Sequence, residues 1–163
     1  MSDILEQKKT STELLQLVSF VIGKEEFGID ILIVKEINRI TQITKMPNSP
    51  DYVEGVINLR GRIIPIVDLR SRLGLPRKES DKNTRIIVLE ISGKTIGFIV
   101  DAVKEVLRVP DSIMEAPPEI VSGVNSEFIK SVGKLEDRLI IIIDQEKLLT
   151  SKEKQELVKL DEN

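Results

Sequence analysis

The chain has 163 residues, a formal net charge of −3, and no Cys, His or Trp. This acidic balance argues against nucleic-acid binding, because a protein that neutralises phosphates needs a basic face. Without Cys or His the chain has no disulfide, no thiolate nucleophile and no imidazole for general-base catalysis or metal binding. We therefore expect a protein that is not an enzyme and that uses no cofactor and no metal.

The N-terminal segment MSDILEQKKTSTE is polar and lacks the apolar centre of a signal peptide. The longest uninterrupted apolar run, 139–143, is far too short to cross a bilayer. We expect residues 1–13 to form a flexible tail. We also expect a cytoplasmic protein that does not insert directly into a membrane.

Short apolar stretches separated by turn residues predict β-strands in the first half of the chain. These strands are expected over 14–22, 27–31, 42–47, 55–61 and 62–69. The segment 31–37 fits a short helical turn as well as a strand. Ser49 followed by Pro50 indicates a brief helical turn over 49–55. Asp68 is placed to cap the short helix that follows it.

The second half repeats this alternation of strands and tight turns. Its strands are expected over 85–91, 95–101, 128–135 and 138–144. Residues Thr150 to Glu153 form a capping-box pattern that opens a polar helix to about Leu160, within a C-terminal helix and tail over 150–163. Several short strands with tight turns predict a mainly β protein built from small barrels rather than from a parallel sheet.

A self-comparison shows that the chain repeats itself. The stretch FGIDILIVKEINRI matches IGFIVDAVKEVLRV, so that Phe27 aligns with Ile96. The stretch RIIPIVDL matches RLIIIIDQ, so that Arg62 aligns with Arg138. The matched pieces keep the same order, and loop insertions account for the wider spacing of the second match. We infer an internal duplication.

The two halves run from about 14 to 76 and from about 84 to 149, and the polar loop RKESDKN separates them. Each half has roughly 65 residues, which is marginal for an independent core. We therefore expect one domain over 14–149, in which the halves pack together or exchange elements.

Asp68 and Asp144 occupy equivalent positions in the two repeats. Two symmetry-related aspartates could serve a carboxylate-dependent hydrolase. Each Asp, however, precedes an amphipathic stretch, as a helix N-cap does, and we favour capping. Two catalytic carboxylates would face one cleft, whereas two caps would each bond their own helix.

The turn at Arg60-Gly61 has no match in the repeat, where Glu136 and Asp137 stand. Gly61 has a backbone explanation, because glycine tolerates the positive φ of a tight turn. The fold gives no explanation for Arg60. Its long side chain with planar donors can pair with a carboxylate of a partner, so we predict a functional role for Arg60.

Two further features admit both a structural and a functional interpretation. Val34-Lys35-Glu36 with Ile37 is either an ordinary half-buried turn or a partner surface. The segment from Arg60 to Lys78 holds six basic residues and only one acidic residue, so it is either a solvated face or a dock for an acidic partner. A generic barrel that binds acidic ligands is therefore a third hypothesis, beside a scaffold and a hydrolase.

The same residues carry a family resemblance. The pieces GIDI, NLRG and PIVD appear in the order typical of the CheW-like coupling proteins of bacterial chemotaxis. The chain resembles this family, in its stand-alone form, from about Leu14 to Leu149. The resemblance implies two small five-stranded Src-homology-3-like barrels related by a pseudo-twofold axis, with short helices and a C-terminal helix.

The resemblance also implies a function. Members of this family are non-catalytic adaptors that bridge the cytoplasmic tips of chemoreceptors (methyl-accepting chemotaxis proteins) and the regulatory domain of the histidine kinase CheA. Arg60 falls on the arginine of the NLRG motif, which is associated with receptor coupling, and the segment from Val34 to Ile37 resembles a partner-contacting segment. The partner-binding residues that we predict are Ile31, Val34, Glu36, Ile37, Arg60 and Gly61.

Overall fold

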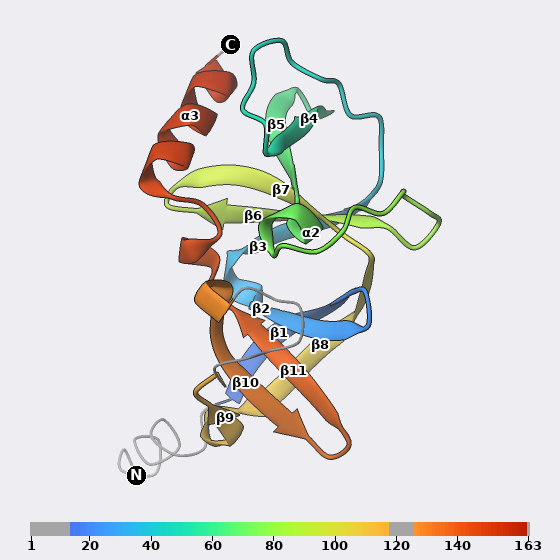
Figure 1. Cartoon of the computed structure of the whole chain (residues 1–163), viewed down its shortest axis with the longest axis vertical. Coiled ribbons are helices and arrows are strands. Elements are labelled where there is room, and N and C mark those ends of the chain that lie inside the picture. Colours follow the sequence, from blue (N-terminus) through green and yellow to red (C-terminus); the bar gives the residue numbers. More distant parts are fainter. Residues whose placement is uncertain (1–13, 118–125, 163) are drawn as a thin grey trace.

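The computed structural model describes residues 14–117 and 126–162. The protein is mainly β, with one sheet of six strands and one of five, and a helix runs beside the five-stranded sheet (Figure 1). The predicted fold class of two small β-barrels with few helices is confirmed, with a sixth strand added to one sheet. The tail predicted over 1–13 lies outside the described residues. No helix within the described ranges is long and apolar enough to span a bilayer.

The six-stranded sheet has the order β8-β1-β2-β11-β10-β9. Its strands are β1 (Leu14–Ile22), β2 (Glu25–Asp30), β8 (Ala102–Pro110), β9 (Met114–Glu115), β10 (Ile129–Leu135) and β11 (Arg138–Ile143). Only β2 and β11 pair in parallel. The edge strands β8 and β9 are joined by a single 3-10 turn, η2 (Asp111–Ile113), so the chain passes directly from one edge to the other and curls the sheet. Two more 3-10 turns, η3 (Ser126–Phe128) and η4 (Gln145–Lys147), flank β10 and β11.

The five-stranded sheet has the order β3-β6-β7-β5-β4. Its strands are β3 (Val34–Arg39), β4 (Val53–Leu59), β5 (Arg62–Asp68), β6 (Arg85–Ile91) and β7 (Lys94–Val100). The 3-10 turn η1 (Ile31–Ile33) leads into β3, and the short helix α2 (Leu69–Arg72) follows β5. The segment after β3 reaches the far edge, where Thr44 exchanges two backbone hydrogen bonds with Val56 of β4, at 2.9 and 2.8 Å. This bridge closes the sheet toward a barrel.

Each sheet takes strands from both sequence halves. The hairpin β1-β2 of the first half joins the six-stranded sheet, and the hairpin β6-β7 of the second half joins the five-stranded sheet. The two parallel pairs have the same register, because Gly28 lies opposite Ile142 and Gly97 lies opposite Ile66. The two alignments found in the sequence therefore relate the two sheets residue by residue.

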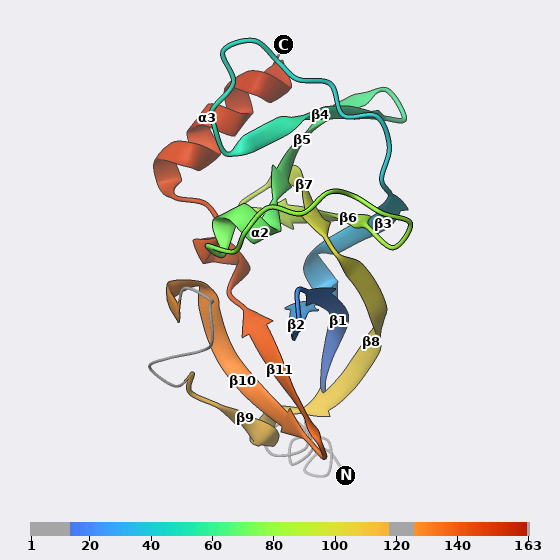
Figure 2. The same ribbon diagram turned by 45° about the vertical axis from the view of Figure 1, so that its right-hand side comes forward.

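The largest apolar cluster lies between the sheets. Phe20 and Phe27 stack in the six-stranded sheet with ring centroids 5.7 Å apart, and the same cluster includes Ile87 and Phe98 of the five-stranded sheet. Each sheet also encloses a smaller cluster of its own. Figure 2 shows the two sheets one above the other, and the chain passes between them from β2 to β3 and from β7 to β8. A close-packed shared core fixes the sheets as one rigid body.

The structure corrects several predicted elements. The expected strand over 42–47 is only the bridge at Thr44. The expected helical turn over 49–55 is a single hydrogen-bonded turn, in which the N–H of Val53 donates to the carbonyl of Pro50 at 3.0 Å, and β4 begins at Val53 because the segment from there on pairs with β5 along a buried face. The segment 31–37 satisfies both interpretations, since the turn η1 is followed by the strand β3. Strand β8 was not predicted.

The C-terminal helix α3 (Ser151–Glu162) begins at the predicted capping box. The backbone N–H of Thr150 donates to Oε1 of Glu153 at 2.9 Å, and the N–H of Glu153 donates to Oγ1 of Thr150 at 3.1 Å. The helix lies along the five-stranded sheet (Figure 2). Its Leu157 is buried in the large apolar cluster between the sheets, which we call the main core.

Candidate functional site

A β-bulge sits near the start of β3. Val34 lies opposite Leu89 and Glu36 lies opposite Val88, so Lys35 is an extra residue on β3. A bulge locally redirects side chains and bends the strand. Here the Nζ atom of Lys35 reaches Oε1 of Glu90 at 3.0 Å. The bulge thus presents Lys35 and Glu36 beside each other at the surface.

The β4-β5 turn brings the predicted arginine to this bulge. Arg60 and Gly61 have φ angles of 52° and 86°, the conformation of a two-residue hairpin turn with positive φ at both positions. The side chain of Asn58 accepts a hydrogen bond from the N–H of Gly61 at 2.9 Å. The guanidinium of Arg60 forms an ion pair with the carboxylate of Glu36. Arg60 therefore has an intramolecular partner that the sequence did not indicate, while 73% of its side chain stays exposed.

Exposed apolar side chains lie along the same segment. Ile37 is 40% exposed and Leu32 of η1 is 87% exposed, whereas Ile31 and Val34 pack half-buried against the main core. Of the predicted residues, Glu36, Ile37, Arg60 and Gly61 are thus at the surface, and Ile31 and Val34 also support the fold. Leu32 was not predicted. The signal for it was the run of four apolar residues from Ile31 to Val34, which a single turn cannot bury on one side.

A pocket of about 240 Å³ opens beside the Glu36–Arg60 pair. It lies at one end of the inner core of the five-stranded sheet, because Ile64 and Val88 of that core form part of its wall. We call it the end pocket. Its lining residues are Lys35, Glu36, Leu59, Arg60, Arg62, Ile64, Val88 and Thr95. A cavity of this size and mixed polarity can receive a side chain of a docked protein.

The basic segment from Arg60 to Lys78 is not the positive face that its composition suggested. Five of its six cations are neutralised by carboxylates. The pairs are Arg60–Glu36, Arg70–Asp101, Arg72–Glu153, Arg77–Glu54 and Lys78–Asp81. Only Arg62 has no ion-pair partner among the residues that the structure describes. These ion pairs argue against the whole segment as a dock for an acidic partner, and they leave Arg62 as its one cation without a carboxylate partner in the described part of the chain.

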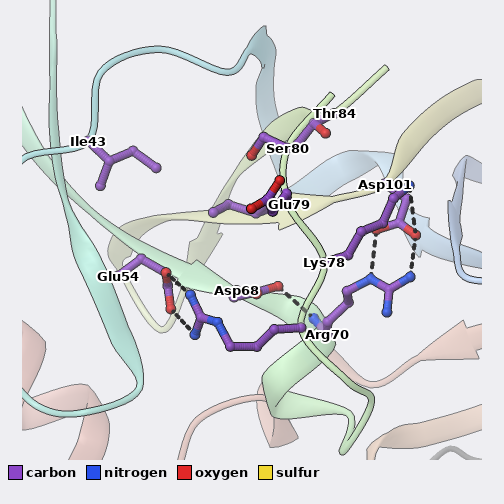
Figure 3. A pocket seen from close by; sticks show the side chains of 11 residues that line it. Ile43, Glu54, Asp68, Arg70, Lys78, Glu79, Ser80, Thr84 and Asp101 are labelled. Atoms are coloured by element: carbon purple, nitrogen blue, oxygen red, sulfur yellow. Dashed lines mark hydrogen bonds and ion pairs between the residues drawn. The ribbon is translucent and has the colours of Figure 1, made fainter. Parts of the chain in front are cut away.

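A second cavity, of about 350 Å³, lies beside the loop that follows α2 (Figure 3). Arg70 donates to both carboxylate oxygens of Asp101, at 3.0 and 2.8 Å, and Arg77 donates to both of Glu54, at 2.9 and 2.7 Å. Burial alone would raise the pKa of Asp101, but hydrogen bonds from Arg70 and from the N–H of Gly23 outweigh burial and lower it. The paired arginines fasten the loop across this cavity.

Asp68 and Asp144 both act as caps. Oδ1 of Asp68 accepts a hydrogen bond from the N–H of Arg70 at 3.0 Å, and Oδ1 of Asp144 accepts one from the N–H of Glu146 at 3.2 Å. Asp68 lines the second cavity, whose lining does not include Asp144. Burial raises the pKa of Asp68, and the hydrogen bond from Arg70 partly offsets this. This geometry favours capping and gives a two-carboxylate hydrolase no shared cleft.

Metal binding has no support in the same part of the chain. Within residues 14–117 and 126–162, no group of three or more His, Cys, Asp and Glu side chains is arranged to hold a metal ion. Two sheets that share one core form a rigid body, and its exposed apolar and charged side chains give it a surface of the kind that binds other proteins.

Comparisons with known proteins identify the family of this protein. A family model described as the CheW-like domain matches residues 16–153, so the chain belongs to the CheW-like domain family. The chain is 40% identical over 138 residues to the chemotaxis protein CheW of Klebsiella aerogenes, covering 85% of this chain and 83% of that protein. It is 35% identical over 152 residues to the chemotaxis protein CheW of Treponema pallidum, covering 91% and 89%.

A solved structure agrees with this assignment. The crystal structure of the scaffolding protein TtCheW from Thermoanaerobacter tengcongensis matches with a TM-score of 0.76 and 39% sequence identity, covering 85% of this chain and 89% of that chain. These relatives place the protein among bacterial chemotaxis proteins.

Proposed function

We propose that this protein is a non-catalytic chemotaxis scaffold that couples the cytoplasmic tips of chemoreceptors to the histidine kinase CheA. Membership of the CheW-like domain family supports this proposal. The observation that carries it is the surface formed by η1, the β3 bulge and the β4-β5 turn, where exposed apolar residues adjoin the Glu36–Arg60 ion pair. In this proposal the protein works in the cytoplasm, held at membrane receptors only through its partners.

We assign the receptor tip to this surface, which we call the coupling face. Apolar side chains such as Leu32 and Ile37 supply affinity when a partner covers them, and a charged group such as Arg60 supplies register and selectivity. The ion pair with Glu36 holds the Arg60 guanidinium in a fixed direction before the partner arrives. Preorganisation of this kind lowers the entropy lost on binding.

The kinase is proposed to bind elsewhere on the same body, through contact between its homologous regulatory domain and one of the two barrels. Coupling between two partners requires two separate sites whose states influence each other. The apolar cluster shared by the two sheets provides the mechanical link, because movement of one sheet is transmitted to the other. The scaffold thereby relays receptor state as kinase geometry, without chemistry of its own.

Reconstitution tests this function. A receptor cytoplasmic fragment and CheA are combined with and without the purified chain, and kinase autophosphorylation is followed with labelled ATP. We expect activation that requires all three components and that the receptor controls. Autophosphorylation that is the same with and without the chain would contradict the proposal.

A pulldown with the same components addresses the hypothesis of a generic barrel that binds acidic ligands. The chain is immobilised, and the receptor fragment and the kinase are applied together with unrelated acidic proteins as competitors. We expect the receptor fragment and the kinase to be retained selectively. Binding of any acidic protein with the same affinity would favour the generic barrel.

A further inference from the structure

Each sheet encloses a small apolar cluster, which we call its inner core. The residues at the hairpin-turn end of the two inner cores can be compared position by position. Arg62 starts β5 and Arg138 starts β11, and each lies four residues before the isoleucine that pairs with a glycine of the parallel neighbour strand. Both arginines also follow a two-residue hairpin turn. Arg62 and Arg138 are therefore structural equivalents.

In the six-stranded sheet, carboxylates of the same chain neutralise the arginine at this end of the inner core. Nη2 of Arg138 lies 3.1 Å from Oε2 of Glu105 and 3.4 Å from Oε2 of Glu26. Glu26 also accepts a hydrogen bond from the hydroxyl of Ser19, which is fully buried. The carboxylate of Glu26 thus occupies the end of this core, and its partner Arg138 holds it there.

In the five-stranded sheet the position equivalent to Glu26 carries no carboxylate, and the position equivalent to Ser19 carries no hydroxyl. The alignment of the repeat that matches Phe27 with Ile96 places Thr95 where the other sheet has Glu26. It also places Val88 where that sheet has Ser19. The shorter threonine side chain leaves unfilled the space that a glutamate would take.

The one carboxylate that the five-stranded sheet keeps at an equivalent position does not pair with Arg62. Glu36, the equivalent of Glu105, pairs with Arg60 instead of Arg62. Arg62 is consequently left with no carboxylate among the described residues. The end pocket of about 240 Å³ lies at these positions, since Arg62, Val88 and Thr95 all line it.

We propose that the end pocket receives a carboxylate side chain of the partner docked on the coupling face, and that Arg62 binds this carboxylate in the place that Glu26 occupies in the other sheet. The inference rests on the proposed function, and the occupant is an Asp or Glu side chain of the receptor tip. The end pocket is continuous with the coupling face, because Glu36 and Arg60 belong to both.

The chemistry of the pocket suits this occupant. A guanidinium binds a carboxylate through two parallel hydrogen bonds, which gives both strength and direction. The wall formed by Ile64 and Val88 is apolar, so it packs against the methylene groups of the entering side chain and excludes water from the ion pair. Both sheets would then contain an arginine–carboxylate pair at this position. In the six-stranded sheet the carboxylate belongs to the same chain, and in the five-stranded sheet it belongs to the partner.

Substitutions that copy the other sheet provide the test. Thr95→Glu supplies the missing carboxylate within the chain, and Thr95→Gln fills the same space without charge. Arg62→Gln removes the cation. Dissociation constants of the full chain for a receptor-tip fragment are measured by calorimetry, and circular dichroism and thermal unfolding check each fold. We expect Arg62→Gln, Thr95→Glu and Thr95→Gln each to weaken binding by about tenfold, because the first removes the cation and the other two occupy the space that the partner's carboxylate would enter.

A scan of the receptor tip completes the test and does not depend on the folding of Thr95→Glu. Each acidic residue of the tip is changed to its amide, and every variant is titrated with wild-type chain and with Arg62→Gln. One position should weaken binding to wild type but have little further effect on Arg62→Gln, because both changes remove the same pair.

The outcomes distinguish the inference from the function on which it rests. If the receptor tip binds Arg62→Gln as tightly as wild type, or if no acidic position couples to Arg62, the inference is overturned while the scaffold function stands. If Thr95→Gln and Thr95→Glu both bound the receptor tip as tightly as wild type, the partner would not enter the end pocket, and this outcome would also overturn the inference. A wild-type chain that binds no receptor tip would overturn both.

Discussion

Arg60 and Glu36, 24 positions apart in the sequence, form an ion pair that ties the β4-β5 turn to the β3 bulge. The six-stranded sheet has a corresponding tie between Arg138 and Glu105. The glutamates are equivalent in the repeat, but the arginines are not, because Arg60 lies within its turn and Arg138 lies after it. In each sheet an Arg–Glu ion pair thus ties the hairpin to the neighbouring segment. Only in the five-stranded sheet is the guanidinium of this pair largely exposed.

The exposure of Arg60 leads to a prediction about Arg60→Glu. The turn should keep its shape, because Glu136 occupies the equivalent turn position with a positive φ of 36°. The lost ion pair is solvent-exposed, so stability should fall by no more than about 1 kcal/mol. Binding to the receptor tip and receptor-controlled kinase activation should both weaken by about tenfold or more, since a cation is replaced beside Glu36 by an anion.

The control for this variant is Lys24→Glu, which makes the same charge change in an exposed turn of the other sheet. We expect Lys24→Glu to leave kinase activation unchanged. Kinase activation by Arg60→Glu equal to wild type would exclude Arg60 from the coupling face. Loss of the folded state would instead show that the Glu36–Arg60 pair is a structural requirement.

Two glycines of the β4-β5 hairpin, one on β4 and one in the turn, should respond very differently to alanine. At Gly55, with φ of 153°, an added Cβ would lie 2.5 Å from the carbonyl oxygen of Thr44, within the backbone bridge that closes the five-stranded sheet. At Gly61, with φ of 86°, an added Cβ meets no atom within 4 Å. We expect Gly55→Ala to cost about 2–4 kcal/mol in urea unfolding, and Gly61→Ala about 1 kcal/mol from backbone strain alone. Equal costs would mean that the Thr44–Val56 bridge adapts freely.

Features that depend on residues close together in the sequence could be predicted from the sequence alone. The duplication, most strands and the capping box of α3 were visible because strand alternation, turn residues and capping signals act over a few neighbouring positions. Strand β8 escaped prediction because the bulge at Lys104 breaks its alternation and leaves three successive residues exposed. The Pro65 in β5 did not disturb that strand, which shows that pattern outweighed a single unfavourable residue here.

Contacts between distant segments could not be predicted from one sequence. The segment from Arg60 to Lys78 looked like a positive face because its carboxylate partners stand as far away as Glu153. Likewise, the structural role of Arg60 depends on Glu36, which stands 24 positions earlier in the sequence. The sequence also could not show that Arg62 lacks a carboxylate partner. That follows only from the ion pairs of the neighbouring cations and from the contacts that the equivalent Arg138 makes.

The buried cap Asp68 leads to a prediction about pH. Because burial raises its pKa above the ordinary value of 3.8, the folded state favours the protonated carboxyl. The stability that Asp68 contributes is therefore complete below that ordinary value and is lost as pH rises through the raised pKa. Asp68→Asn keeps an oxygen that can accept from the N–H of Arg70 but carries no charge. We expect Asp68→Asn to be at least as stable as wild type at pH 7, and any advantage to shrink toward pH 4.

Urea unfolding of wild type, Asp68→Asn and Asp68→Ala at several pH values checks this expectation. Asp68→Ala loses the cap and should be less stable than Asp68→Asn by about 1 kcal/mol at every pH. If Asp68→Asn were less stable than wild type at pH 7, with a deficit that disappears in acid, the ionised carboxylate would be a stabilising partner of Arg70 and Arg77 rather than a buried cost.

The attachment of α3 depends on Arg72. Its guanidinium donates to both oxygens of Glu153, at 3.0 and 2.8 Å, and to the carbonyl of Leu148 at 3.0 Å, and it lies over the ring of Tyr52 with 5.3 Å to the ring centroid. The paired side chains are only 15% and 18% exposed. Removal of Arg72 would take the guanidinium hydrogen bonds from Glu153 and from the carbonyl of Leu148 in a largely buried site, although the N–H of Thr150 would still donate to Glu153, so Arg72→Ala should cost about 2–4 kcal/mol.

Arg77 is the matched control for Arg72, because it makes an equally bidentate pair with Glu54 while its side chain is 69% exposed. We expect Arg77→Ala to cost less than about 1 kcal/mol, since water replaces the lost hydrogen bonds. Arg72→Lys should recover little, because an ammonium cannot span both oxygens of Glu153. Urea unfolding measures all three variants, and limited proteolysis reports whether α3 becomes accessible. Equal costs for Arg72→Ala and Arg77→Ala would show that burial does not set the strength of these pairs.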